Sequence, residues 1–304
     1  MQYDYHPGEL EVQQRAGVRD SAKRLAGSIH AVVPVIAGAF LEERRFVVLA
    51  TADANNRPWA SVLSGLPGFA RVLDDGTIRI EAAPAAGDPL SANLETSPFV
   101  GLIAPDLSTR RRLRINGRLE TGTDGAILIH VDQAYSNCPK YIQRREGWQP
   151  TVEVSPQLVQ RSTTLRSHQR DRIRRADTFF LATLNPGEGA DASHRGGMPG
   201  FVKVNGQELI WPDYAGNSMF NSLGNIAQHP WAGIVVPHFD TGSTLQLTGR
   251  ATIDWNLEHS AAMPGAERLV RLAVEEVVAI EGVFPPGLRL VEYSPFNPSE
   301  NARA

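Results

Sequence analysis

The chain has 304 residues with 42% hydrophobic and 21% charged side chains, and its formal net charge is -3. This composition is typical of a soluble globular protein, and the lack of a basic excess argues against a general nucleic-acid binder. The single cysteine, Cys138, excludes an internal disulfide framework and fits a reducing compartment.

The N-terminal region predicts neither a secretory signal nor a membrane span. Asp4 and Glu9 stand where a signal peptide carries basic residues. The longest apolar stretch, residues 26–40, is too short to cross a bilayer and contains His30 and Pro34. We therefore expect a cytoplasmic protein without membrane contact. Residues 1–40 would form an N-terminal helical segment, with a buried helix over 26–40.

The rest of the chain repeats itself at a single offset. Leu49-Ala50-Thr51 returns as Leu181-Ala182-Thr183, which sets the offset at 132 residues (181 - 49). The same offset relates Gly65, Pro67, Gly68 and Phe69 to Gly197, Pro199, Gly200 and Phe201, and Gly117-Arg118 to Gly249-Arg250. This many ordered matches at one spacing indicate a duplication. We predict a first repeat over 41–150 and a second over 151–304.

Each repeat predicts the same elements in the same order. Short apolar runs rich in β-branched and aromatic residues alternate with turn signals, and one helix interrupts them. Strands are expected over 46–51, 59–63, 70–73, 77–81, 100–104, 111–119 and 126–133, and a helix before Asn93. In the second repeat they are expected over 179–183, 191–195, 202–205, 208–211, 233–237, 244–253 and 268–279, with a helix before Asn225. The predicted fold class is mainly β (α+β), with two tandem six-stranded antiparallel barrels and flanking helices.

Several motifs resemble those of the FMN-binding split barrels of the pyridoxamine 5'-phosphate oxidase superfamily. Segment 193–201, Ser-His-Arg-Gly-Gly-Met-Pro-Gly-Phe, is similar to the family's first hairpin in its flavin-binding version. Segment 213–221 resembles the stretch that handles the flavin phosphate, and 137–142, Asn-Cys-Pro-Lys-Tyr-Ile, is a signature of a large bacterial branch. The resemblance implies split barrels that hold flavin at the interface of two barrels. Here the two repeats could pair within one chain, and the chain is also expected to form a homodimer.

Differences between the repeats predict one flavin site for each chain. Before the helix of the second repeat, segment 213–221 carries polar side chains suited to a phosphate, whereas the matching residues 82–87 carry almost none. The first repeat has a cationic run at 110–112 where the second has Gly242-Ser243-Thr244. The expected cofactor-binding residues are Ser193, His194, Arg195, Pro212, Asp213, Asn217, Ser218, Asn221, Arg111, Arg112, Lys140 and Tyr141.

The function implied by the resemblance is an FMN-dependent oxidoreductase that acts on a small organic substrate. No catalytic side chain is assigned, because the flavin itself carries the redox step. The histidine and cysteine spacing favours no metal site. Two alternatives stay open: a non-catalytic protein that binds or senses flavin or haem, with His194 or His238 as haem ligands, and a reductase that uses the deazaflavin F420. Cys138 is expected to be structural, and Gly68 and Gly200 are expected in turns with positive φ.

Overall fold

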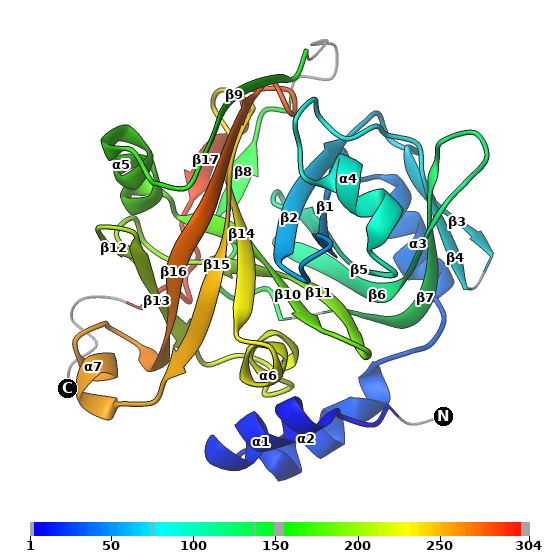
Figure 1. Cartoon of the computed structure of the whole chain (residues 1–304). Coiled ribbons are helices and arrows are strands. Elements are labelled where there is room, and N and C mark those ends of the chain that lie inside the picture. The colour runs from blue at the N-terminus through cyan, green and yellow to red at the C-terminus, as the bar shows by residue number, and fades with distance from the viewer. Residues whose placement is uncertain (1–2, 75, 137, 149–154, 299–304) are drawn as a thin grey trace.

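A computed structural model describes residues 3–74, 76–136, 138–148 and 155–298. Two large antiparallel sheets dominate it, one for each repeat, and they lie side by side in Figure 1. The first repeat contains α3 (Val35–Glu42), β1 (Phe46–Ala52), β2 (Pro58–Ser64), β3 (Ala70–Asp74), β4 (Thr77–Ile80), α4 (Leu90–Thr96), β5 (Phe99–Asp106), β6 (Arg111–Thr121) and β7 (Ile127–Ser136). The second contains α5 (Ser167–Arg175), β10 (Thr178–Asn185), β11 (Gly189–Gly196), β12 (Lys203–Asn205), β13 (Glu208–Tyr214), α6 (Asn221–Gln228), β14 (Trp231–His238), β15 (Ser243–Asp254), α7 (Leu257–Ala261) and β16 (Ala266–Glu281).

The two sheets share one strand order. The first runs β2-β1-β5-β6-β7-β4-β3 and the second β11-β10-β14-β15-β16-β13-β12, so each strand corresponds to the strand numbered nine higher. This agreement confirms the predicted tandem, mainly β fold. The sheets have seven and eight strands rather than six. The difference arises because the β3–β4 hairpin joins the sheet through β7, and because the long β16 also pairs with β9 (Gln157–Ser162).

Apolar side chains form separate cores inside each sheet and a third core between the repeats. Along β1, Leu49 belongs to the core of the first sheet, whereas the adjacent Val48 belongs to the core between the repeats. Along β10, Leu181 belongs to the core of the second sheet, whereas the adjacent Phe180 belongs to the core between the repeats. Successive residues of a strand point to opposite faces, so both faces of these strands are buried. This explains why their sequences are continuous apolar runs without polar alternation.

The two repeats approach so closely that a glycine is required at two equivalent positions. A Cβ atom on Gly101 of β5 would lie 2.6 Å from the backbone nitrogen of Ala192 on β11. A Cβ atom on Gly233 of β14 would lie 2.3 Å from the backbone oxygen of Pro58 on β2. Gly101 and Gly233 are related by the same offset of 132 residues. The contact between the repeats is therefore approximately two-fold symmetric.

The N-terminal helices lie across the second repeat. Helix α1 (Pro7–Arg15) packs on α6, with α2 (Arg19–Leu25) next to it in Figure 1. His6 and Glu9 form a capping box at the start of α1, in which Glu9 Oε2 accepts from the His6 backbone nitrogen at 2.9 Å. A Cβ atom on Gly8 would lie 2.2 Å from the carbonyl oxygen of Gly224 in α6. The two helices therefore pack backbone to backbone.

The single buried helix expected over 26–40 is wrong. A short 3-10 helix, η1 (Ala26–Ser28), ends before His30, whose backbone pairs with Ala134 of β7. Helix α3 begins only after Pro34, because proline lacks an N–H group and restricts the residue before it to extended conformations. The first residues of α3, Val35 and Ile36, are 87% and 78% exposed.

Three short strands were not predicted from the sequence: β8 (Arg144–Glu146), β9 and β17 (Arg289–Glu292). β8 pairs with β17, so the C-terminal segment returns to the linker between the repeats. The glycine turns were predicted correctly, since Gly68 and Gly200 have φ of 93° and 92°. The domain boundaries after residues 40 and 150 stay a prediction, and the second of them lies outside the described residues.

Candidate functional site

A small polar cavity of about 80 Å³ lies between the two repeats. One wall is the start of β6 in the first repeat, and another is the end of β11 in the second. The segment 138–141 and the loop that follows β13 complete it. Its lining residues are Arg112, Arg114, Cys138, Lys140, Tyr141, Ser193, His194, Arg195, Gly196, Phe201, Pro212, Tyr214, Gly216 and Asn217.

The cavity is rich in cationic side chains. Arg112 and Arg114 are two residues apart on β6, so their side chains lie on the same face of the strand. Arg114 is paired with the buried carboxylate of Asp191. Arg112 has no carboxylate partner among the described residues. Burial, together with the positive charges of Arg114 and Arg195, lowers the pKa of Arg112 to about 9. The cavity therefore contains a cation that the protein itself does not neutralise.

His194 is a neutral imidazole with one free N–H group. Burial, followed by the charges of Arg112 and Arg195, holds the pKa of His194 well below its usual value. Its Nδ1 lies 3.3 Å from Arg112 Nη1, which has only hydrogens to donate, so Nδ1 must accept. The ring proton is then on Nε2, which is buried and has no partner among the described residues. Nε of Arg114 and Nε of Arg195 are also buried without a partner.

Two tyrosines form an aromatic side of the cavity. The rings of Tyr141 and Tyr214 have centroids 4.9 Å apart and are tilted by 38°. The Tyr141 hydroxyl donates to the backbone oxygen of Ala215 at 3.0 Å. This bond ties the linker between the repeats to the loop after β13.

The loop after β13 is held from outside by helix α1. Its residues Ser218 and Phe220 have positive φ of 62° and 63°, which is a strained conformation for residues with a side chain. Gln13 Nε2 of α1 donates to the Met219 backbone oxygen at 3.0 Å. Asn221 Nδ2 donates to Glu9 Oε1 at 2.6 Å. Helix α1 therefore fixes the loop that brings Asn217 to the cavity.

Most of the residues predicted from the sequence line this cavity. They are Ser193, His194, Arg195, Pro212, Asn217, Arg112, Lys140 and Tyr141. Four others lie elsewhere. Asp213 pairs with Arg268 at 3.2 Å, Ser218 is absent from the lining, Asn221 bonds Glu9, and Arg111 lies over the Phe40 ring at 5.0 Å. At the start of α6, the Glu9 carboxylate accepts from the side chain of Asn221. Asn137 lies outside the described residues.

Sequence reasoning missed Arg114, Tyr214 and the N-terminal contacts. The alternation of Arg112, Arg114 and Asn116 along one strand was a signal for Arg114, because these residues share a face. No local signal placed Glu9 and Gln13 against segment 219–221, which is about two hundred residues away. The contact depends on how α1 crosses α6.

The position equivalent to the cavity in the other half of the interface is filled. Subtracting the offset of 132 from His194 and Arg195 gives Val62 and Leu63, which are buried. Adding it to Arg114 gives Gln246, whose Nε2 donates to Ser61 Oγ at 3.0 Å and to Asp88 Oδ2 at 3.0 Å. This second half-interface thus forms a packed core in which the Gln246 amide nitrogen is hydrogen-bonded. The asymmetry supports one ligand cavity for each chain.

The donor set of the cavity fits the phosphate group of FMN. Phosphate oxygens accept from guanidinium and imidazole N–H groups, and three such donors are unpartnered here. A water molecule occupies roughly 30 Å³ of liquid, so the enclosed space takes a phosphate but not a three-ring flavin. Tyr141 and Tyr214 supply the aromatic surface that a flavin ring requires. Arg112, Arg114, His194 and Arg195 would hold the phosphate.

None of the helices in the described part of the chain has both the length and the apolar character of a membrane span. Among the same residues, no group of three or more His, Cys, Asp or Glu side chains is placed to bind a metal ion.

Comparison with known proteins identifies related sequences and structures. A family model described as pyridoxamine 5'-phosphate oxidase matches residues 37–159 and again 165–284. HupZ of Group A Streptococcus is 11% identical with a TM-score of 0.30, over 40% of this chain and 98% of that one. HutZ of Vibrio cholerae, named as a haem storage protein, is 17% identical with a TM-score of 0.23, over 31% and 84%. An FAD-binding protein of Mesorhizobium loti is 14% identical with a TM-score of 0.25, over 39% and 96%. No curated protein matched the chain.

Proposed function

Because the chain belongs to the pyridoxamine 5'-phosphate oxidase family, whose model matches both repeats, we propose that the cavity between the repeats binds the phosphate of FMN. We propose further that the protein is an FMN-dependent oxidoreductase that acts on a small organic substrate. Bound flavin would supply the transfer of a hydride or of electrons. The protein residues would orient the flavin, hold its charge and exclude water.

The observation that carries this proposal is the uncompensated charge of Arg112. A buried cation without a counter-ion is costly, and its cost is removed by an anionic ligand. Arg114, His194 and Arg195 line the same small space, and each has a buried side-chain N–H group without a partner among the described residues. A phosphate dianion satisfies both requirements at once. Lys140, which also lines the cavity, adds a further positive charge.

The test compares two adjacent arginines of β6. Arg112→Gln removes the cation in the cavity, whereas Arg111→Gln removes a cation on the opposite face of the strand, over Phe40. FMN affinity is measured by fluorescence quenching on titration. We expect Arg112→Gln to weaken FMN binding about tenfold or more, as for the loss of a charge-assisted hydrogen bond. Arg111→Gln should bind FMN like the wild type.

The ligand-free stability of the same variants gives an independent readout. Arg112 is buried and repelled by Arg114 and Arg195, so Arg112→Gln should keep or raise the melting temperature while FMN affinity falls. Equal FMN affinity in both variants and the wild type would refute the assignment of the phosphate to this cavity. If the protein binds no flavin at all, the proposal that FMN is its cofactor is wrong.

An absorbance spectrum of the purified protein separates the alternative cofactors. Flavin gives two broad bands, and haem gives one sharp, intense band. The neutral His194 imidazole is chemically able to bind a haem iron, but its free nitrogen carries the proton, because Nδ1 accepts from Arg112. The flavin assignment is therefore favoured, and deazaflavin F420 is tested by titration in the same assay.

We place the protein in the cytoplasm, since its single cysteine is free and exposed, as suits a reducing compartment. We also propose a homodimer. The flavin cavity is complete within one chain, so dimer formation would not be needed for binding. Light scattering with and without FMN tests whether the protein is a homodimer and whether FMN binding depends on the dimer.

A further inference from the structure

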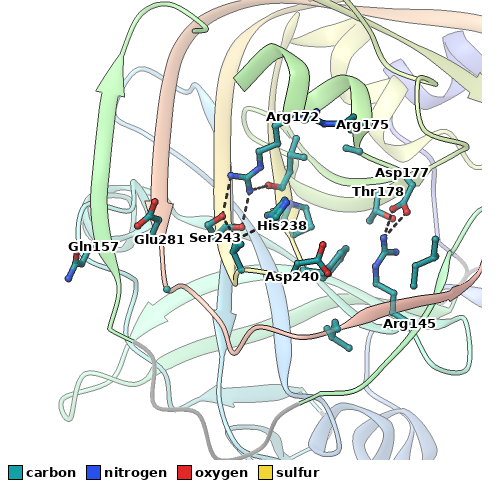
Figure 2. Close-up of a pocket in the computed structure, with 18 of the residues that line it drawn as sticks. Arg145, Gln157, Arg172, Arg175, Asp177, Thr178, His238, Asp240, Ser243 and Glu281 are labelled. Atoms are coloured by element: carbon teal, nitrogen blue, oxygen red, sulfur yellow. Dashed lines mark hydrogen bonds and ion pairs between the residues drawn. The ribbon is translucent and has the colours of Figure 1, made fainter. Parts of the chain in front are cut away.

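A second, larger cavity lies in the second repeat, outside the interface between the repeats. This groove of about 1010 Å³ runs between α5, the β14–β15 turn and the end of β16. Figure 2 shows it with Arg172 and Arg175 on the side of α5, and with His238 and Ser243 facing them. The segment 141–145 separates the groove from the flavin cavity, since Tyr141 lines the flavin cavity and Arg145 lines the groove.

Arg172 is a largely buried cation at this groove. Its guanidinium donates to the backbone oxygens of Val236 at 2.8 Å and Ser243 at 2.9 Å, and to Ser243 Oγ at 3.3 Å. All three acceptors are neutral. No carboxylate of the described residues forms an ion pair with it, and burial lowers the pKa of Arg172 to about 10. The guanidinium is held in position, but its charge is not neutralised.

A chain of hydroxyl groups extends from Arg172 along the groove. Ser243 Oγ lies 2.8 Å from Thr241 Oγ1, which lies 2.8 Å from His238 Nδ1. Arg175, on the same helix as Arg172, is exposed at the rim. Burial, then the charge of Arg172, lowers the pKa of His238, so the imidazole is neutral at pH 7. Hydroxyl groups, an imidazole and two guanidinium groups are the donors that bind phosphate and carboxylate groups.

Acidic residues also line the groove and limit where an anion would bind. Asp177 is engaged with Arg145 Nη2 by two bonds of 2.7 and 2.9 Å. Asp240 and Glu281 are exposed, and the charge of Asp240 acts to raise the pKa of His238, against burial and Arg172. They favour a ligand whose remainder carries hydroxyl groups or a positive charge. The groove volume of about 1010 Å³ lies at the upper end of the range of sites for small organic molecules, roughly 300–1,000 Å³.

The first repeat has no such cluster. Subtracting the offset of 132 from Arg172, Arg175 and His238 gives Phe40, Glu43 and Asp106. There, Asp106 is paired with Arg44 at 3.0 Å. The cationic groove is thus specific to the second repeat, as the flavin cavity is specific to one half of the interface.

We propose that this groove binds a small organic anion, with its phosphate or carboxylate group placed at Arg172, Arg175 and Thr241. The site is separate from the flavin cavity and does not depend on the proposed cofactor. Bound anion would neutralise Arg172 and accept from the Arg175 guanidinium and the Thr241 hydroxyl.

The test is calorimetric titration of the full chain with inorganic phosphate and, separately, with acetate, at constant ionic strength set by chloride. Arg175→Gln and Thr241→Val each remove a donor from an exposed residue of the groove. Arg172→Gln removes the central cation. Arg174→Gln is the matched control, because Arg174 lies on the same helix but pairs with Asp171. Arg112→Gln distinguishes anion binding in the flavin cavity from anion binding in the groove.

We expect saturable binding that Arg172→Gln and Arg175→Gln each weaken about tenfold, with Thr241→Val weaker in effect and Arg174→Gln unchanged. Phosphate binding without acetate binding would identify a phosphate site, and the reverse a carboxylate site. If Arg172→Gln does not fold, Arg175→Gln and Thr241→Val decide the question. Binding that is lost in Arg112→Gln but retained in the groove variants would overturn the proposal. Absence of saturable binding of either anion would also overturn it.

Discussion

The two interface glycines permit a test in which one half of the molecule is the control for the other. Gly101→Ala places a methyl group 2.6 Å from Ala192 N and 2.7 Å from Asp191 Cα. Gly233→Ala places one 2.3 Å from Pro58 O and 2.9 Å from Trp59 Cα. The atoms that would be contacted are backbone atoms, which cannot rotate away, so the two repeats must separate slightly.

The expected cost is that of overpacking a buried contact, about 1–3 kcal/mol for each variant. For a chain of this size the melting temperature should fall by roughly 2–10 °C. The effect on ligand binding should differ between the variants. Gly101→Ala presses on Asp191, which is paired with Arg114 at the flavin cavity. Gly233→Ala presses on β2, at the half-interface that is filled by packed side chains.

Both variants are measured by thermal unfolding and by FMN titration. Gly27→Ala is the control, because a Cβ atom there meets nothing within 4 Å. We expect similar losses of stability in the two interface variants and weaker FMN binding only in Gly101→Ala. Unchanged melting temperatures in both would refute the close approach of the repeats. Equal loss of FMN affinity in both would refute a single cavity beside β11.

Two further predictions concern helix α1. Gln13→Ala should weaken FMN binding severalfold, because it removes the hydrogen bond to Met219 O, while Gln14→Ala, on the exposed side of the same helix, should not; equal affinities on titration would contradict the role of α1. Burial raises the pKa of Glu9 to about 7. The folded state therefore binds the Glu9 carboxyl proton more tightly than the unfolded chain does. As the pH rises from roughly 4 to 7, Glu9 lowers the free energy of unfolding. In chemical denaturation, Glu9→Gln should gain stability relative to the wild type over that range, by at most about 3 kcal/mol, and a difference that is constant with pH would contradict the buried carboxylate.

The sheets of the two repeats were predictable because each strand that they share has a local signature that occurs twice. Gly206 is a turn signal between β12 and β13, and it has a positive φ of 62° in the turn that joins them. Continuous apolar runs at β1 and β10 predicted strands buried on both faces. The helix over 26–40 failed because apolar composition outweighed Pro34 in the prediction. Strands β8, β9 and β17 are too short to show a period, and their pairing depends on tertiary contacts.

The candidate site was predictable only in part, for a physical reason. Residues such as Arg112 and His194 stand out because their internal counterparts, Thr244 and Val62, lack charge. Asn221 stands out in the same way, since its counterpart is Pro89, yet its side chain bonds Glu9. Asp213 has the acidic Glu81 as its counterpart and pairs with Arg268. A comparison of the repeats identifies the positions at which one repeat has a polar side chain and the other has an apolar one. It does not say whether the polar group serves a ligand or another side chain.

The filled half-interface shows how this divergence is accommodated. Asp88 is buried there, and its carboxylate accepts from Ser61 Oγ at 2.5 Å, Leu90 N at 2.8 Å and Gln246 Nε2 at 3.0 Å. The carboxylate is thus held by neutral donors, with the buried Val62 and Leu63 on the same strand as Ser61. At the equivalent place in the cavity, Ser193 Oγ lies 2.9 Å from Ser222 Oγ, and unpartnered guanidinium and imidazole groups replace the apolar pair. Since packed apolar side chains stabilise an interface without a ligand, the filled half can hold the repeats together. The other half can then keep donors that lack a partner among the described residues, and these are the groups to which the proposed anion would bind.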